Sequence, residues 1–141
     1  MKSSVPGVEP IFYKKREIAC IYRSSIRISD RLLFLTPDEN AFQIGIHERK
    51  KGTSIPAHIH NCPKPLEIPE IQEFLYIVSG SVKITLLTDK LETIAVKILR
   101  AGDSILLKTQ AHRVEFLDDA RIIELKQGPY PGHEYAKTYL E

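Results

Sequence analysis

The stretch Glu73-Phe-Leu-Tyr-Ile-Val-Ser-Gly80-Ser-Val-Lys-Ile-Thr-Leu-Leu87 decides the fold class of this chain. It contains two runs rich in β-branched and aromatic residues, 73–78 and 81–87, and the turn residues Ser79 and Gly80 lie between them. Runs of this length and composition, bounded by turn residues, are typical of short β-strands. We therefore expect two consecutive strands joined by a tight turn.

The same pattern recurs along the rest of the chain, whereas a helical period is hard to find. Short apolar runs return every eight to twelve residues and are separated by residues such as Gly, Pro, Asn and Asp. This spacing predicts an all-β fold, either a sandwich or a barrel, with one short helical turn at 134–140. The expected strands are 17–23, 31–35, 41–48, 58–60, 73–78, 81–87, 94–99, 104–107, 113–117 and 121–125.

The length of the chain indicates one domain. Its 141 residues are close to the common size of a compact domain. We expect an N-terminal arm at 1–16, a β-barrel at 17–126 and an irregular tail at 127–141. Residues 61–72 hold three prolines and show no clear period, so they predict a long loop of a kind that is often functional.

Composition and charge exclude several classes of protein. Lys and Arg number 20 against 18 Asp and Glu, and this net charge of +2 lacks the clustered positive field that binds nucleic acid. The longest apolar stretch, 74–82, has nine residues, far short of the roughly 20 that span a membrane. The first residues carry no apolar core typical of a secretory signal, so we expect a cytoplasmic protein with free thiols at Cys20 and Cys62.

The histidines carry most of the chemical information. His58 and His60 are separated by one residue, and in a strand such positions face the same side. Glu73 opens the next long strand and His112 lies at the start of a later one, so three strands of a barrel can converge on one interior point. Three imidazoles and one carboxylate suit Fe(II), Mn, Ni, Zn or Cu(II) better than Ca or Mg. By its spacing alone, the His-x-His pair fits an accidental or surface pair better than a metal site.

The stretch from Gly52 to Gly80 resembles the first motif of the cupin superfamily, G(X)5HXH(X)3,4E(X)6G. Five residues separate Gly52 from His58, as in the motif. Six residues separate Glu73 from Gly80, which also matches. In this resemblance His58, His60 and Glu73 occupy the positions of metal ligands.

A second motif of the same superfamily, G(X)5PXG(X)2H(X)3N, has a weaker counterpart between Gly102 and His112. The spacing is one residue short, Lys108 and Gln110 stand near the family's Pro and Gly, and Phe116 replaces the Asn. His112 is the only histidine in reach of this motif, so the resemblance implies that it is the fourth ligand.

The carboxylate of the first motif is reached through a long gap. Twelve residues separate His60 from Glu73, where the family has three or four. Glu67 and Glu70 lie inside this gap and are alternative ligands, but only Glu73 has the family's distance to Gly80. The resemblance implies one divalent transition metal per chain, Fe, Mn, Ni or Zn, held by His58, His60, Glu73 and His112.

The implied fold is a double-stranded β-helix, the cupin jelly roll, in which two antiparallel sheets close into a small barrel. If the proposed ligands point inward, alternation along their strands places Leu75, Ile77, Val114 and Phe116 inward as well. The interior is then an apolar chamber around a polar centre, which is typical of sites for small ligands.

Two further strand faces supply candidate substrate-binding residues. Gln43 and His47 share one face of the expected strand before the first motif, and Lys126 shares a face with Glu124 near the end of the last strand. Solvated strand faces show the same pattern. The sequence assigns no catalytic residue.

The resemblance implies a small metal-dependent enzyme, an oxygenase or a Lewis-acid isomerase, that acts on a polar small molecule, with sugar-related molecules among the candidates. Two alternatives stay open. One is a binding module that senses or stores a metal or small ligand, and the other is a metal-free sugar-nucleotide isomerase or epimerase that uses histidine acid–base chemistry. Small cupins commonly pair, and the arm at 1–15 is long enough to lie on a neighbouring subunit, so we also expect a homodimer.

Overall fold

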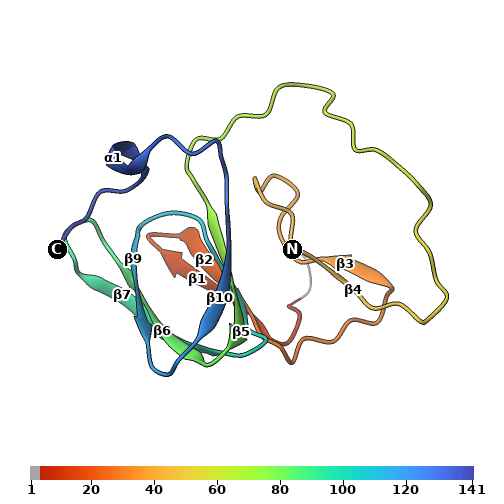
Figure 1. Ribbon diagram of the computed structural model, residues 1–141, viewed down its shortest axis with the longest axis horizontal. Coiled ribbons are helices and arrows are strands. Elements are labelled where there is room, and N and C mark those ends of the chain that lie inside the picture. Colours follow the sequence, from red (N-terminus) through yellow and green to blue (C-terminus); the bar gives the residue numbers. More distant parts are fainter. Residues whose placement is uncertain (1–3) are drawn as a thin grey trace. The chain divides into compact units, whose positions relative to one another are not determined.

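The structure is a computed structural model that describes residues 4–141 (Figure 1). Within these residues it contains ten strands, paired antiparallel, and one helix of four residues, so the expected all-β class is confirmed. The elements are β1 (Val8–Tyr13), β2 (Arg16–Tyr22), β3 (Leu32–Phe34), β4 (Gly45–His47), β5 (Glu73–Ser79), β6 (Ser81–Leu87), β7 (Thr93–Arg100), β8 (Ser104–Leu107), β9 (Ala111–Phe116), β10 (Arg121–Lys126) and α1 (His133–Ala136).

The chain divides into two compact units. The first, which we call the sheet unit, comprises Met1–Ile26 and Glu70–Glu141, and the second, the small unit, comprises Arg27–Pro69. The sheet unit holds β1, β2, β5 to β10 and α1, whereas the small unit holds β3 and β4. The expectation of a single domain over 1–141 stays a prediction.

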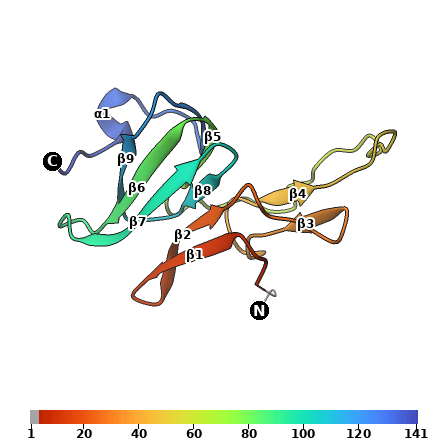
Figure 2. The same cartoon turned by 90° about the horizontal axis from the view of Figure 1, so that it is seen from below.

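The sheet unit is built from two antiparallel sheets (Figure 1 and Figure 2). One has five strands in the order β1-β2-β8-β5-β10, and the other has three in the order β7-β6-β9. The consecutive strands β5 and β6 form as the sequence predicts, but they belong to different sheets. The turn at Gly80 is therefore a corner between the sheets.

The core of the sheet unit combines side chains from both sheets. Along β5 the alternate residues Leu75 and Ile77 are 3% and 0% exposed, as the predicted alternation requires. From the other sheet, Ile84 and Leu99 belong to the same cluster, so the inner faces pack against each other. The buried cluster consists of Ile11, Ile18, Ala19, Ile21, Leu75, Ile77, Val82, Ile84, Leu86, Leu99, Ile105 and Leu107.

Most expected strands lie within two residues of the observed ones, but β1 was missed. It falls in the arm expected at 1–16 and pairs with β2. Pro10 lies inside it, and proline argues against a strand because it lacks a backbone donor. The five-stranded sheet tolerates Pro10 because β1 is an edge strand. The helical turn expected at 134–140 is present but shorter, as α1.

The small unit contains a two-stranded hairpin and a long irregular segment. β3 and β4 pair with each other, and β4 is shorter than the strand expected at 41–48. Residues 48–69 form no strand, so the strand expected at 58–60 is wrong. Prolines on both sides of it remove backbone donors that a sheet would use. They are Pro56, Pro63, Pro65 and Pro69.

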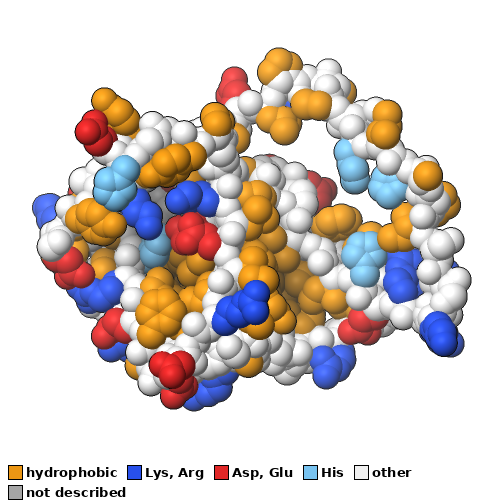
Figure 3. Space-filling model, in the orientation of Figure 1, with side chains coloured by type: hydrophobic (Ala, Val, Ile, Leu, Met, Phe, Trp, Pro, Cys, Tyr) orange, Lys and Arg blue, Asp and Glu red, His pale blue; other side chains and the backbone are white. Residues whose placement is uncertain are grey.

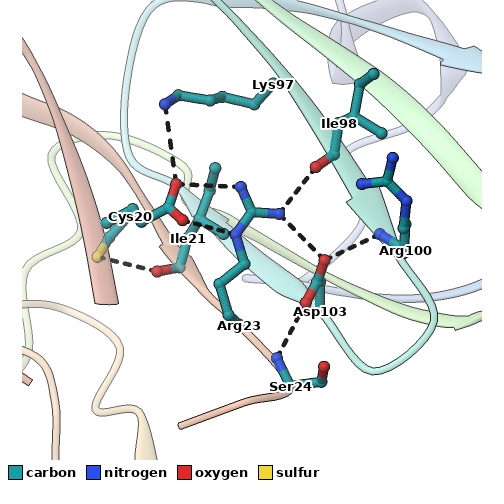
Figure 4. A network of polar contacts seen from close by, with 9 residues as sticks. Cys20, Ile21, Arg23, Ser24, Lys97, Ile98, Arg100 and Asp103 are labelled. Atoms are coloured by element: carbon teal, nitrogen blue, oxygen red, sulfur yellow. Dashed lines mark hydrogen bonds and ion pairs between the residues drawn. The ribbon is translucent and has the colours of Figure 1, made fainter. Parts of the chain in front are cut away.

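A polar network around Arg23 links elements of both sheets (Figure 4). The Arg23 guanidinium donates to the Glu9 carboxylate on β1 at 2.8 Å, to the Ile98 carbonyl on β7 at 2.8 Å and to Asp103 Oδ2 at 3.1 Å. Asp103 also accepts from the backbone amides of Ser24 and Arg100, each at 3.0 Å. Asp103 is 6% exposed, so these bonds compensate the loss of its hydration.

The corner at Gly80 depends on the absence of a side chain. Gly80 has φ +77°, and a Cβ there would lie 2.4 Å from the Asp119 carbonyl oxygen. We expect Gly80→Ala to lower the free energy of unfolding by about 3 kcal/mol or more, because it adds a backbone clash to the conformational strain. Gly52→Ala is the matched control, since Gly52 has φ +86° with nothing within 4 Å, and should cost about 1 kcal/mol. Equal losses of unfolding free energy in Gly80→Ala and Gly52→Ala, measured by urea unfolding, would contradict the predicted clash with Asp119.

The Asp103 network predicts acid sensitivity. Burial alone would raise the pKa of Asp103, but bonds from the amides of Arg100 and Ser24 and from Arg23 outweigh it and lower the pKa below 3.8. Ionised Asp103 therefore stabilises the folded state. This stabilisation is complete above the pKa that Asp103 has in the unfolded chain, and it is lost as the pH falls through the lower pKa of the folded state. Asp103→Asn should cost about 2–3 kcal/mol at pH 7, and the difference from wild type should narrow below pH 3.8.

Urea unfolding monitored by circular dichroism between pH 7 and pH 2.5 measures this narrowing, at steps of about half a pH unit. Asp89→Asn, at an exposed turn position, is the control and should change the free energy of unfolding at pH 7 by less than about 0.5 kcal/mol. A stability difference between Asp103→Asn and wild type that stays constant across this range would contradict the role assigned to the carboxylate.

Candidate functional site

The sheet unit contains a pocket of about 710 Å³. Its walls come from β5, β9 and β10 and from residues 136–141, which run from the last residue of α1 to Glu141. Apolar and polar side chains line it, and Figure 3 shows acidic, basic and histidine side chains gathered in the region of β9 and β10. The lining includes Leu75, Val114, Phe116 and Ile122 on the apolar side and Glu73, His112, Glu124 and Lys126 on the polar side.

Glu73 and His112 meet in this pocket. Glu73 is the first residue of β5 and His112 is the second residue of β9, so they come from different sheets. His112 Nε2 lies 3.6 Å from Glu73 Oε2. Their side chains are 30% and 15% exposed, respectively. The structure thus brings together two of the four residues that the motifs propose as metal ligands.

Burial biases both groups toward their neutral forms. The pKa of Glu73 is raised, first by burial and then by the nearby carboxylate of Glu124, although Lys126 and Lys137 oppose the rise. The pKa of His112 is lowered, first by burial and then by the positive charge of Lys137. Glu73 and His112 therefore form a polar contact between an acid and a base that both resist ionisation.

Strand β10 adds two further charged side chains to the pocket. Lys126 stands directly opposite Glu73 in the register of β5 and β10, and Glu124 stands opposite Leu75. Lys126 Nζ is 3.5 Å from Glu124 Oε1. Lys126 and Glu124 thus share the face expected from alternation, and this face lines the pocket. A role of Lys126 in substrate binding stays a prediction.

His58 and His60 form a pair of their own in the small unit. Their rings lie 5.1 Å apart between centroids, at an interplanar angle of 71°, and both residues are exposed. His58 Nδ1 lies 2.8 Å from the Pro56 carbonyl, which only accepts, so Nδ1 carries the proton. In the neutral form of this ring, the lone pair is then on His58 Nε2. The histidines stay adjacent even though the segment is not a strand.

The two other residues that the sequence proposed for substrate binding lie in the small unit. The Gln43 side-chain amide donates to the carbonyls of Pro37, Asp38 and Asn40 at 2.9–3.2 Å. Its carbonyl accepts from Thr36 Oγ1 at 3.3 Å, and Thr36 is fully buried. Gln43 thus holds the turn between β3 and β4. His47 ends β4 and is exposed.

The alternative carboxylates have different surroundings from Glu73. Glu70 accepts a hydrogen bond from Arg16 Nη2 at 2.8 Å. Bonds from Thr109 and Arg16 lower the pKa of Glu70, so it is held as a carboxylate outside the pocket lining. Glu67 is exposed in the small unit. Of the three candidates, Glu73 lines the pocket beside His112.

Both cysteines are free thiols, as expected. Cys20 is buried, and burial raises the pKa of its thiol to about 11, which leaves very little reactive thiolate at neutral pH. Cys62 is exposed, and its Sγ donates to the Lys64 carbonyl at 3.1 Å. These surroundings assign Cys20 to the packed interior and Cys62 to the surface.

The part of the pocket that sequence reasoning missed is the segment after α1. Residues 136–141 line the pocket, although the sequence indicated only an irregular tail. Lys137 is close enough for its charge to act on both Glu73 and His112. The tail has no strand period, so no pattern in the sequence places it there.

Among residues 4–141, no group of three or more His, Cys, Asp or Glu side chains is arranged to hold a metal ion. The proposed ligands instead occur as two pairs, Glu73 with His112 in the sheet unit and His58 with His60 in the small unit. Each pair supplies two donors of the type that transition metals prefer.

Comparison with known proteins adds no relative. No family model, no curated protein and no solved structure matches this chain. In the described residues no helix is long and apolar enough to cross a membrane. Function is therefore inferred from the motif residues and from the pocket in which two of them meet.

Proposed function

We propose that this protein is a metal-binding cupin that takes up a polar small molecule in the pocket of the sheet unit. The observation that carries the proposal is the 3.6 Å contact between Glu73 Oε2 and His112 Nε2 inside that pocket. The two motifs name these residues independently, and the residues come from strands of different sheets. If the resemblance to the two motifs were accidental, there would be no reason for Glu73 and His112 to line the same pocket.

The proposed fold of the sheet unit is a double-stranded β-helix. Its support is a five-stranded and a three-stranded antiparallel sheet that contribute to one hydrophobic core. The chain passes from one sheet to the other between β5 and β6, at Gly80. Jelly rolls are built from two antiparallel sheets that the chain visits in turn.

The proposed cofactor is one divalent transition metal, Fe, Mn, Ni or Zn. Glu73 and His112 offer a carboxylate oxygen and an imidazole nitrogen, and this mixed donor set suits these ions. His58 also fits, because metal-binding histidines commonly donate their other ring proton to a carbonyl, as His58 does to Pro56. The proposed ligands of the sheet unit are Glu73 and His112, and the first motif also names His58 and His60 in the small unit.

When bound, such a metal supplies a Lewis acid for a substrate oxygen or a redox centre for O₂. The chain's own residues bind and orient the ligand. Leu75, Val114 and Ile122 give the pocket an apolar wall that displaces water from one side of the ligand. Lys126, opposite Glu73, offers an ammonium group at the polar end.

A second candidate is metal-free acid–base catalysis of the isomerase or epimerase type. The observation that favours it is that the sheet unit alone brings Glu73, His112 and Lys126 to one pocket. An imidazole and a carboxylate in contact can take a proton from a substrate and return it at another atom. Ligand binding without turnover would use the same pocket, so the metal content is the first property to measure.

Metal retention distinguishes the candidate carboxylates. We expect protein purified without added metal or chelator to hold about one metal ion per chain by inductively coupled plasma mass spectrometry. Glu73→Ala should lower the retained metal by roughly tenfold or more, because it removes a ligand beside His112. Glu67→Ala and Glu70→Ala are the matched controls and should retain the wild-type amount. Circular dichroism checks that each variant is folded.

Three results would overturn parts of this proposal. Equal losses in Glu70→Ala and Glu73→Ala would show that Glu73 is not the distinguishing ligand. Less than about 0.1 ion per chain, with no uptake of added Fe, Mn, Ni or Zn, would remove the metal and leave the metal-free candidate. Unchanged retention in the double variant His58→Ala/His60→Ala would exclude the small unit from the ligand set.

We also propose that the chain forms a homodimer. The outer face of β5 and β10 carries exposed apolar side chains, including Tyr76 and its cross-strand neighbour Ile123, which are 39% and 53% exposed. Such a face favours association with a second copy. We expect multi-angle light scattering to give the mass of a dimer, and Ile123→Lys to shift it toward the monomer. A monomer mass for the unsubstituted chain would contradict the proposal.

A further inference from the structure

The segment from Gly132 to Glu141 contributes residues 136–141 to the pocket lining, and most of its residues are exposed. The side chains of α1 are not buried, and residues 137–141 are all exposed. The backbone amides of Tyr135 and Ala136 bond to the Gly132 carbonyl, so these bonds lie within the segment. Gly132 has φ +105°, a conformation that favours glycine and suits a hinge.

One ion pair fastens the far end of this segment to β9. Arg113 Nε donates to Glu141 Oε1 at 2.7 Å, and Arg113 Nη2 donates to Glu141 Oε2, which makes the contact bidentate. Both side chains are exposed, at 37% and 55%. Bidentate geometry gives the contact a defined direction, while exposure keeps it weak enough to open.

Two lysines from different segments of the sheet unit line the pocket near Glu73. Lys126 projects from β10 opposite Glu73. Lys137 approaches from the segment after α1, where its charge acts on both Glu73 and His112. Both lysines line the pocket. Paired lysines on two walls provide the donors and the charge that bind a carboxylate or phosphate.

We propose that residues 132–141 are a flap over the pocket, and that Lys137 on the flap and Lys126 on β10 together bind the carboxylate or phosphate group of a small anionic ligand. The Arg113–Glu141 pair is the latch that holds the flap closed. The inference uses the pocket of the proposed function and names its ligand class. It does not require a bound metal.

The ligand class is tested with inorganic phosphate and succinate, and with erythritol as a neutral control. The full chain is treated with chelator and titrated at constant ionic strength while backbone amide shifts are followed by NMR. We expect both anions to shift amides at 126 and 136–140, and erythritol to shift neither group. Lys137→Gln should weaken anion affinity by about tenfold. Lys137→Arg should restore most of it, because the charge is kept.

The matched control is Lys83→Gln, since Lys83 lies on β6 and pairs with Glu115 at 2.9 Å, outside the pocket lining. It should bind both anions as the unsubstituted chain does. An equal loss in Lys83→Gln and Lys137→Gln would overturn the inference, and so would the absence of shifts up to about 50 mM anion. If the chain binds the anions but takes up no metal, the flap proposal is supported, and only the proposed metal binding by Glu73 and His112 is overturned.

The latch is tested by amide hydrogen exchange of residues 135–140. Glu141→Gln should speed exchange roughly threefold, because it removes the carboxylate that Arg113 holds. The exchanged pair Arg113→Glu/Glu141→Arg should restore slow exchange. Exchange unchanged in Glu141→Gln would show that the ion pair does not hold the flap.

Discussion

The register of β5 between β8 and β10 is the constraint on which both the core and the pocket depend. It sets Glu73 opposite Leu107 on one side and opposite Lys126 on the other. Because side chains alternate along a strand, this register buries Leu75 and Ile77 and leaves Glu73 at the end of the same inner face. A slip by one residue would expose the apolar set and turn Glu73 away from His112.

The pocket begins where the inner faces change from apolar to polar residues. On β10 the same face carries Ile122, then Glu124, then Lys126, and all three line the pocket. Burial near this edge is what shifts the protonation of Glu73 and His112, so the packing that stabilises the sheets also tunes the site. The segment after α1 adds the charge of Lys137 to a pocket lined mainly by strand residues.

The sequence predicted the strands well where turn residues bound them. Ser81–Leu87 and Ser104–Leu107 were placed without error, because Gly80 and Gly102 mark their starts. Prediction failed where proline and position in the sheet mattered: β1 contains Pro10 yet forms at an edge, and 58–60 lacks a partner strand. The substrate-binding role of Gln43 stays a prediction; the structure adds that its side-chain amide donates to carbonyls of the turn between β3 and β4, which no local pattern indicated.

The sequence by itself determined the all-β class and the choice of Glu73 and His112 as candidate ligands, because strand periodicity and motif spacing are local properties. Only the tertiary structure decided that β5 and β6 belong to different sheets, that Glu70 is engaged by Arg16, and that residues 136–141 wall the pocket. These depend on contacts between residues distant in the chain, and no local pattern records which distant partner a side chain meets.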